Sequence, residues 1–221
     1  MAQRPNLYVF SGLLSVLDKA HQPDKALHYF AEIARRGLTP NAHCFSALIS
    51  ALGTAGRVAD AEHHFAQMAR LGVVPDAYCF SALIAALGTA GRVDDAERHF
   101  ARMAQRGVVP DLPCFNALIS GFAEAGRVDD AERWFHKITT MGRLTPNLVS
   151  YNALIKANQV AQRPEKAVEL LQEMTRKVLP SPPLSLSLSL SRVCRVGASC
   201  VPAADPQQFV PLLRRACDQM W

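Results

Sequence analysis

Apolar residues recur along the chain with a helical period. They are spaced i, i+3, i+4 and i+7, which places them on one face of a helix. The clearest set is Phe45, Leu48, Ile49 and Leu52. After a glycine a second stripe of the same kind follows, made of Val58, Ala61, Phe65 and Met68. The pattern therefore predicts two amphipathic helices joined by a tight turn at Gly56, where a helix C-terminus needs a residue that tolerates positive φ.

The two-helix pattern repeats every 35 residues. Residues 42–76 and 77–111 are identical at 28 of 35 positions without a gap, an agreement that chance does not give. The same spacing divides the chain into a stub at 1–6 and units at 7–41, 42–76, 77–111, 112–147 and 148–181. One hairpin has two apolar faces and cannot bury both, so neighbouring hairpins must stack. We therefore expect an all-α fold, an α-solenoid in which helix-turn-helix repeats form a right-handed superhelix with the first helices along one surface.

Small and acidic residues occupy fixed places in the repeat. Aspartates such as Asp60 and Asp95 fall in the first turn of each second helix, where the helix dipole favours a carboxylate. Each unit closes with a glycine and then a proline, which end the second helix. Small residues are also expected where helices pack closely. Those in the second unit are Ala47, Ala51, Ala61 and Ala66.

The composition changes abruptly towards the C-terminus. Residues 184–191 alternate leucine and serine four times, and such low complexity is typical of disorder, which we expect over 182–204. A translated dinucleotide repeat, or an intron read as coding sequence, is our hypothesis for its origin. Residues 205–221 can form a short helix that either caps the end of the solenoid or has no role. Its apolar side would hold Phe209, Leu212 and Leu213.

Charge and cysteine content narrow the class of protein. The 221 residues carry 24 basic and 19 acidic side chains, a net charge of +5, which permits an anionic partner without requiring one. Six cysteines with no CxxC pair and no secretory leader do not make a disulfide framework, so a reducing compartment is expected. No apolar run approaches the roughly 20 residues that cross a bilayer, so we expect no membrane partner. No transit peptide is visible, so either the protein stays where it is made or the start of the sequence is missing.

Histidines and cysteines recur at the repeat period instead of clustering as metal ligands do. His64 and His99 occupy one position in successive units. Another position holds Cys44, Cys79 and Cys114. Successive first helices should stand about 8–10 Å apart, too far for one Zn²⁺ with bonds near 2.3 Å to join them. We expect no metal site, no cofactor, no small-molecule substrate and no catalytic constellation, and hence no enzyme.

The repeat carries the motifs of a known family. Four of the five units contain an aromatic residue, Ser or Asn, and then Ala-Leu-Ile, at 45–49, 80–84, 115–119 and 151–155. Three units share a central Ala-Gly-Arg-Val-x-Asp-Ala, and four close with Val-Pro-Asp or Thr-Pro-Asn. Together these resemble the pentatricopeptide repeat in a P-type-like array of about five units, over about four fifths of the chain. The tetratricopeptide repeat has a period of 34 and lacks both the aromatic-Ser/Asn start and the Pro-Asp/Asn end.

The resemblance implies binding of single-stranded RNA with one base per unit, in organellar RNA processing, stability or translation. Unstacked bases can be read on their Watson–Crick edges by one or two side chains per repeat. In the family, the polar residue after the first aromatic and the residue that closes the unit face one base. The matching pairs are Ser11 with Asn41, Ser46 with Asp76, Ser81 with Asp111, Asn116 with Asn147, and Asn152 with Ser181. For the first four pairs the family's code then implies 5′-A-G-G-pyrimidine-3′, and the fifth pair would add C. The alternative reading of these residues is that they cap helices and form turns.

The resemblance also implies contacts beside each base and to the phosphates. The base-flanking position holds Tyr8, His43, Tyr78, Pro113 and Val149. Lys19 fits the family's phosphate-binding lysine, but the matching places in the later units are not basic. They hold Thr54, Thr89, Glu124 and Val160. Few cations and about five base contacts of roughly 1–3 kcal/mol each predict micromolar binding at best.

A protein-interaction scaffold is the alternative function. Its groove would hold a peptide or a partner helix. The small excess of positive charge favours such a scaffold over an RNA-binding protein. Polar pairs in register favour RNA instead, as the leading function, with protein partners as a further expectation. The family resemblance points to a mitochondrion or chloroplast.

Overall fold

The computed structural model describes residues 6–177, which form ten α-helices and no strand. The helices are α1 (Leu7–Lys19), α2 (Pro23–Arg35), α3 (Ala42–Thr54), α4 (Val58–Arg70), α5 (Ala77–Thr89), α6 (Val93–Gln105), α7 (Leu112–Glu124), α8 (Val128–Thr140), α9 (Leu148–Val160) and α10 (Pro164–Lys177). The helices α1, α3, α5, α7 and α9 each begin on the first residue of an expected unit. The expectations for 178–181, 182–204 and 205–221 lie outside the described residues.

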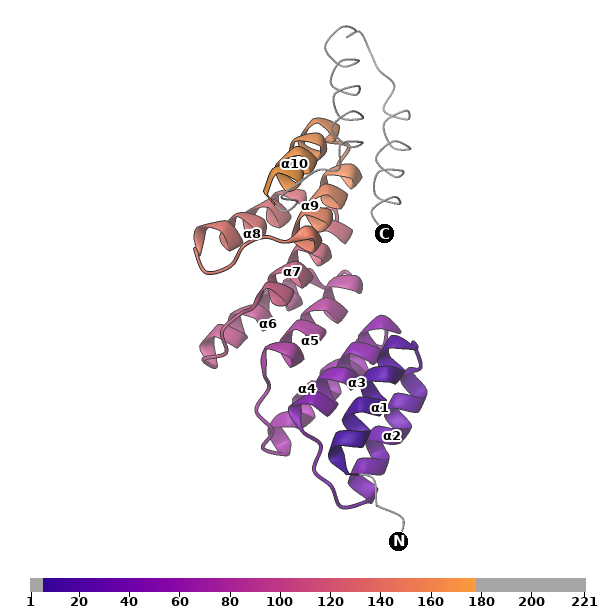
Figure 1. Cartoon of the computed structure of the whole chain (residues 1–221). Coiled ribbons are helices and arrows are strands. Elements are labelled where there is room, and N and C mark those ends of the chain that lie inside the picture. The colour runs from indigo at the N-terminus through magenta and orange to yellow at the C-terminus, as the bar shows by residue number, and fades with distance from the viewer. Residues whose placement is uncertain (1–5, 178–221) are drawn as a thin grey trace, which may run out of the picture.

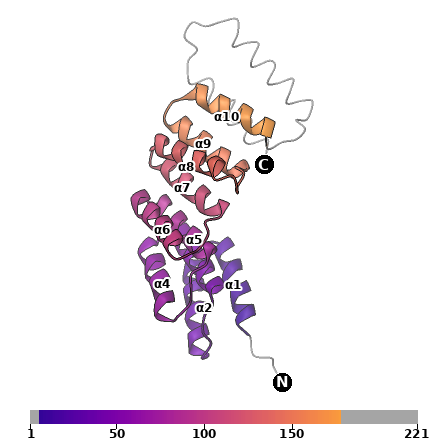
Figure 2. The ribbon, with the colours of Figure 1, turned by 90° about the vertical axis from the view of Figure 1, so that its left-hand side faces the viewer.

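The helix pairs stack into an elongated array, from α1 and α2 at one end to α9 and α10 at the other (Figures 1 and 2). The first helices contact one another in sequence, α1 with α3, α3 with α5, α5 with α7 and α7 with α9. Each of α2, α4, α6 and α8 packs on the first helix of its own repeat and on that of the next. The all-α solenoid expected from the repeat is confirmed, and the first helices form one continuous layer in it.

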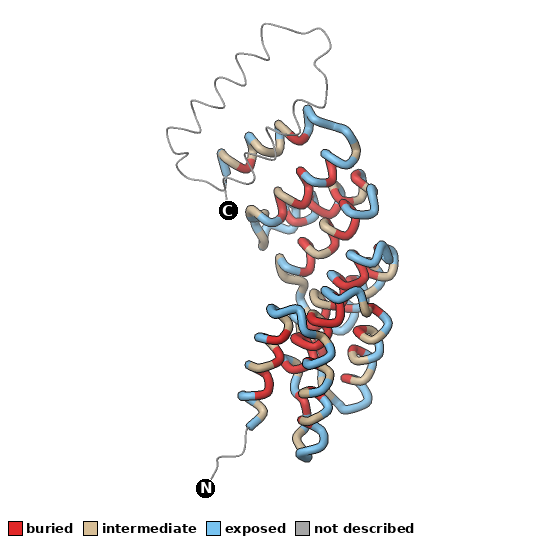
Figure 3. The backbone as a smooth tube through the Cα atoms, turned by 90° about the vertical axis from the view of Figure 1, so that its right-hand side faces the viewer, coloured by how far each residue is buried: buried red, intermediate tan, exposed pale blue. Residues whose placement is uncertain are grey.

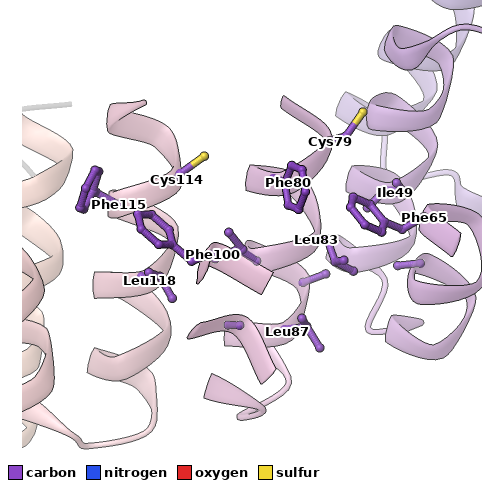
Figure 4. Close-up of a cluster of buried hydrophobic side chains, with 14 of the residues drawn as sticks. Ile49, Phe65, Cys79, Phe80, Leu83, Leu87, Phe100, Cys114, Phe115 and Leu118 are labelled. Carbon is purple, nitrogen blue, oxygen red and sulfur yellow. The ribbon is translucent and has the colours of Figure 1, made fainter. Parts of the chain in front are cut away.

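The predicted apolar stripes form a core that continues from repeat to repeat (Figure 3). Both stripes of the second repeat are buried, including Phe45, Leu48 and Met68. Each joint is closed by a second-helix aromatic ring that meets the first-helix ring of the next repeat edge to face. The ring centroids lie 5.1 Å apart for Phe65 and Phe80 and 5.0 Å for Phe100 and Phe115. Figure 4 shows these two joints side by side. Successive repeats therefore share one core and cannot move independently.

The turn between the two helices of a repeat uses a left-handed residue, as the sequence predicted. Gly56, Gly91 and Gly126 have φ of 73°, 74° and 71°. After α3, the Gly56 N–H donates to the Gly53 carbonyl and the Arg57 N–H to the Leu52 carbonyl, which ends the helix with two satisfied carbonyls. The matching residues of the first and last repeats are His21 and Gln162, with φ of 51° and 55°.

Glycines let the first helices approach closely near their C-terminal ends. A Cβ built on Gly88 of α5 would lie 2.9 Å from the Gly121 Cα of α7. A Cβ on Gly53 of α3 would lie 2.6 Å from the Ala86 Cβ of α5. Side chains larger than these cannot fit unless the helices separate, so the spacing of the first-helix layer is set by these residues.

One expectation about small residues is wrong. Ala47, Ala51 and Ala61 are buried between helices, but Ala66 is exposed on α4. The buried stripe of this helix passes through Phe65 and Met68, and a turn of 100° per residue carries position 66 away from it. None of the described helices is long and apolar enough to cross a membrane.

Candidate functional site

The residues that close each unit cap the first helix of the next. The side-chain Oδ1 of Asn41, Asp76, Asp111 or Asn147 accepts the backbone N–H three residues ahead. The N···O distances are 2.9 Å to Cys44, 2.9 Å to Cys79, 3.2 Å to Cys114 and 3.1 Å to Ser150. The capping role that was the alternative reading is therefore present. The cap bond uses only one terminal atom of each side chain, the Oδ1. The second carboxylate oxygen of an aspartate, or the NH₂ group of an asparagine, takes no part in the cap.

The serines of the first three predicted pairs bond back to their own helices. Ser11, Ser46 and Ser81 donate their hydroxyl protons to the carbonyls of Tyr8, His43 and Tyr78, at 2.9, 3.0 and 3.0 Å. Ser11 and Ser46 are buried and Ser81 is half-buried. Because the proton is used within the helix, each hydroxyl oxygen can offer only lone pairs to a ligand.

The structure joins one predicted pair directly. The Asn116 Nδ2 donates to the Asn147 Oδ1 at 3.4 Å across the joint between repeats 4 and 5. No such bond links the serine to the closing residue in the pairs of repeats 1 to 3. Asn152 is half-buried on α9, and its expected partner Ser181 lies outside the described residues.

The sequence did not single out Ser150, which binds both asparagines of the fourth pair. Its hydroxyl donates to the Asn116 Oδ1 at 2.6 Å and accepts the Asn147 backbone N–H at 3.2 Å. Ser150 is fully buried. The repeat alignment could have drawn attention to Ser150, since the same position holds cysteine in the three preceding units.

The predicted base-flanking residues protrude from the first turns of the first helices. Tyr8 is 83% exposed, Tyr78 66% and Val149 53%, and His43 and Pro113 are also exposed. Large side chains held in solvent at one position of successive repeats form a row that can stack against planar groups.

Lys19, the predicted phosphate contact, is exposed at the C-terminal end of α1. The other basic side chains on the first helices include Lys156, whose Nζ lies 3.1 Å from a carboxylate oxygen of Glu124. The layer of first helices therefore offers little free positive charge.

An ion-pair ladder links successive second helices. The arginine before each of α4, α6, α8 and α10 reaches back to an acid on the preceding second helix. These pairs are Arg57 with Asp24, Arg92 with Glu62, Arg127 with Asp94 and Arg163 with Asp129, at 2.6–2.9 Å. Arg57, Arg92 and Arg127 also bind the aspartate three residues ahead, which is the acidic first-turn residue of the repeat. The ladder joins the repeats and occupies charges that could otherwise bind phosphate.

The recurring cysteines and histidines belong to the core and the repeat joints. Burial raises the pKa of the Cys79 thiol to about 12 and also raises the pKa of Cys44 and Cys114. His64 packs edge to face on Phe30, and His99 packs in the same way on Phe65. Within residues 6–177, no group of three His, Cys, Asp or Glu side chains is arranged to hold a metal ion.

Comparisons with known proteins agree with the motifs of the repeat. A family model described as the pentacotripeptide-repeat region of PRORP matches residues 3–183. No curated protein sequence matches the chain.

Solved structures of pentatricopeptide repeat proteins share the fold. PPR10, a maize protein, in complex with an 18-nt psaJ RNA element matches with a TM-score of 0.70 at 22% identity, over 80% of this chain and 26% of that one. The PPR domain of Arabidopsis thaliana protein-only RNase P 1 in complex with tRNA matches with a TM-score of 0.61 at 19% identity, over 82% of this chain and 94% of that one. The chain thus spans about a quarter of the length of PPR10. Because the family model covers most of the sequence, the chain belongs to the pentatricopeptide repeat family.

Proposed function

We propose that the chain binds single-stranded RNA, with one base at each of the four complete pairs. The observation that carries this proposal is the set of hydrogen-bonding atoms left over at each pair once the helix caps are formed. Those atoms differ from repeat to repeat, and each set is complementary to the Watson–Crick edge of one kind of base.

Repeats 2 and 3 offer acceptors only. The second carboxylate oxygen of Asp76 or Asp111 and the lone pairs of the Ser46 or Ser81 hydroxyl remain after the cap and the bond to the helix carbonyl. Guanine presents two adjacent donors on this edge, N1–H and N2–H₂. We therefore assign guanine to both repeats.

Repeats 1 and 4 differ because asparagine replaces aspartate. In repeat 1, the Asn41 Nδ2 offers donors beside the Ser11 oxygen, a mixture that suits the donor and acceptor of adenine. In repeat 4, the cap leaves over the Asn147 NH₂ group, and Asn116 keeps one N–H beyond the one that it donates to the Asn147 Oδ1. Two donors suit the adjacent acceptors N3 and O2 of a cytosine, which is a pyrimidine. The sequence read is then 5′-A-G-G-pyrimidine-3′, the order that the family resemblance implies.

The proposed role is accessory and non-catalytic, in organellar RNA processing, stability or translation. The solved relatives hold a psaJ RNA element and a tRNA, which supports an RNA ligand here. The layer of first helices carries little free positive charge, so affinity should depend on base contacts more than on phosphates and should fall only shallowly with salt.

Fluorescence anisotropy with the full chain tests this function. A labelled single strand containing AGGC is compared with its scrambled form at two salt concentrations, and we expect tighter binding of AGGC with Kd in the micromolar range. Changing Ser46→Ala together with Asp76→Asn keeps the helix cap but alters the second pair, and should weaken AGGC binding about five- to tenfold. Asn6→Asp is the matched control, because Asn6 caps α1 in the same way and is not a member of the four pairs.

Three possible results distinguish base-specific RNA binding from non-specific binding and from a protein scaffold. Loss of preference in the double variant with an unchanged control supports base reading. Equal binding of both strands by the unaltered chain contradicts it. No binding to either strand at low salt would favour the protein scaffold instead.

A further inference from the structure

We infer that Ser150 is a positioning residue that makes repeat 4 select cytosine over uracil. The inference rests on the proposed function and deepens it, because it concerns how one of the four pairs distinguishes two pyrimidines. It follows from the hydrogen bonds that Ser150 makes to both members of the pair.

The backbone fixes the orientation of Asn147. Its Oδ1 accepts the Ser150 N–H at 3.1 Å to cap α9, so its NH₂ group must point away from the helix terminus. The Ser150 hydroxyl oxygen in turn accepts the Asn147 backbone N–H at 3.2 Å, and the two bonds together form a capping box.

That box determines what the Ser150 hydroxyl can do. Its oxygen already accepts the Asn147 N–H, so its single proton is directed to a second acceptor. The nearest is the Asn116 Oδ1 at 2.6 Å, with the Asn147 Oδ1 further away at 3.1 Å. Ser150 therefore holds the Asn116 amide with its oxygen towards α9 and its NH₂ group towards Asn147.

The NH₂ group of Asn147 is then left for a ligand, together with the second N–H of Asn116, whose first N–H donates to the Asn147 Oδ1. Cytosine offers two adjacent acceptors, N3 and O2, and can satisfy both amides. Uracil offers N3–H between its two carbonyls, and that donor would meet another donor. An unpaired donor in a partly buried site costs the full desolvation of the group, so the fixed amides should discriminate against uracil. If the Asn116 amide could turn over, its Oδ1 would accept the uracil N3–H and the discrimination would fall.

The residues that match Ser150 in the earlier repeats do not bridge the two members of a pair. The Cys79 and Cys114 thiols donate to the carbonyls of Ala42 and Ala77, at 3.3 and 3.6 Å, and each also lies against the closing aspartate of a pair, Asp76 or Asp111. Neither thiol bonds to the serine of that pair, so neither bridges its two members as Ser150 does. Within the described residues, the serine bridge is confined to the joint between repeats 4 and 5. Cysteine at 150 would therefore keep the packing of the other repeats while losing the strong hydrogen-bond donor.

The test compares the full chain with Ser150→Cys and Ser150→Ala on two labelled strands, AGGC and AGGU in identical flanks. The measured quantity is the ratio of the two Kd values. Cys79→Ala is the matched control, because it alters the same position two repeats earlier and touches neither asparagine. Side-chain amide exchange by NMR in the RNA-free protein reports the Asn116 bond independently of RNA.

We expect the unaltered chain and the control to prefer AGGC, and both Ser150 variants to lose about three- to tenfold of that preference through tighter binding of AGGU. Faster exchange of the Asn116 amide protons in the variants should accompany the change. A merely structural role would weaken both strands equally and leave the ratio intact, which would overturn the inference alone. An unaltered chain that binds neither strand would overturn the proposed function, and this inference with it.

Discussion

At the scale of single residues, the closing position of each repeat does two things with one side chain. Its Oδ1 caps the next first helix, and its other terminal atom is the one that we propose faces a base. Replacing such a cap by alanine costs about 0.5–2 kcal/mol of stability, which would be confused with a loss of binding. Exchanges between Asp and Asn preserve the cap and change only the leftover atom, so they are the variants that isolate recognition.

Two histidines at the repeat joints make stability depend on pH. Burial lowers the pKa of His64 and His99, which pack against Phe30 and Phe65. The charged groups around His64 are His63, Asp60 and Arg57, with Gln67 bonded to its Nδ1, and those around His99 are Arg102, Glu62, Arg98 and Arg92. The folded state thus favours the neutral ring, whereas the unfolded chain takes up a proton near pH 6.5.

We therefore predict that the free energy of unfolding falls as the pH is lowered below about 6.5. Urea unfolding at pH 7.5 and 5.5 measures the effect. His99→Trp should reduce the difference, since Trp134 fills the same position in repeat 4 and does not titrate. An equal pH dependence in that variant would show that other groups are responsible.

At the scale of helices, the two layers are held together by different forces. The first helices meet through Gly88, Gly121 and their counterparts, which bring backbones into contact. The second helices are linked by ring contacts such as His64 with Phe30 and by the arginine ladder, whose pairs are largely exposed and individually weak. The close joint of the first helices should therefore dominate the spacing of the repeats.

Gly88→Ala tests this joint. The added Cβ would lie 2.9 Å from the Gly121 Cα, which is backbone and cannot move aside, so we expect a loss of about 1–3 kcal/mol. Gly12→Ala on α1 is the control, because nothing lies within 4 Å of its Cβ. There the better helix propensity of alanine should add about 0.5–1 kcal/mol. Chemical denaturation measures both, and a stabilised Gly88→Ala would contradict the account of the joint.

The helices were predictable because each buried stripe is local and repeated, so that Phe45 and Leu48 indicate their face without any knowledge of the neighbours. The turn at Gly56 was predictable for the same reason. Ala66 was not, because small residues have no apolar preference strong enough to mark a face. The Ser150 bridge was also missed, since it joins Asn116 across 34 residues and only the stacked geometry brings the two together.

At the scale of the whole molecule, four of the predicted pairs lie wholly within residues 6–177. If each binds one base, as proposed, repeat 1 would offer both donors and acceptors, repeats 2 and 3 acceptors, and repeat 4 donors. An RNA sequence would have to match that order. A site of four bases would be short and of modest affinity, so recognition should be tested by base preference more than by binding strength.

The most direct measurement transfers the repeat 4 atoms into repeat 2. The chain carrying Ser46→Asn, Asp76→Asn and Cys79→Ser is titrated by anisotropy against four strands that differ only at the second base of AGGC. One base per repeat predicts that the preferred second base changes from guanine to cytosine while the other three positions keep their preferences. A folded variant that still prefers guanine at that position would contradict the account.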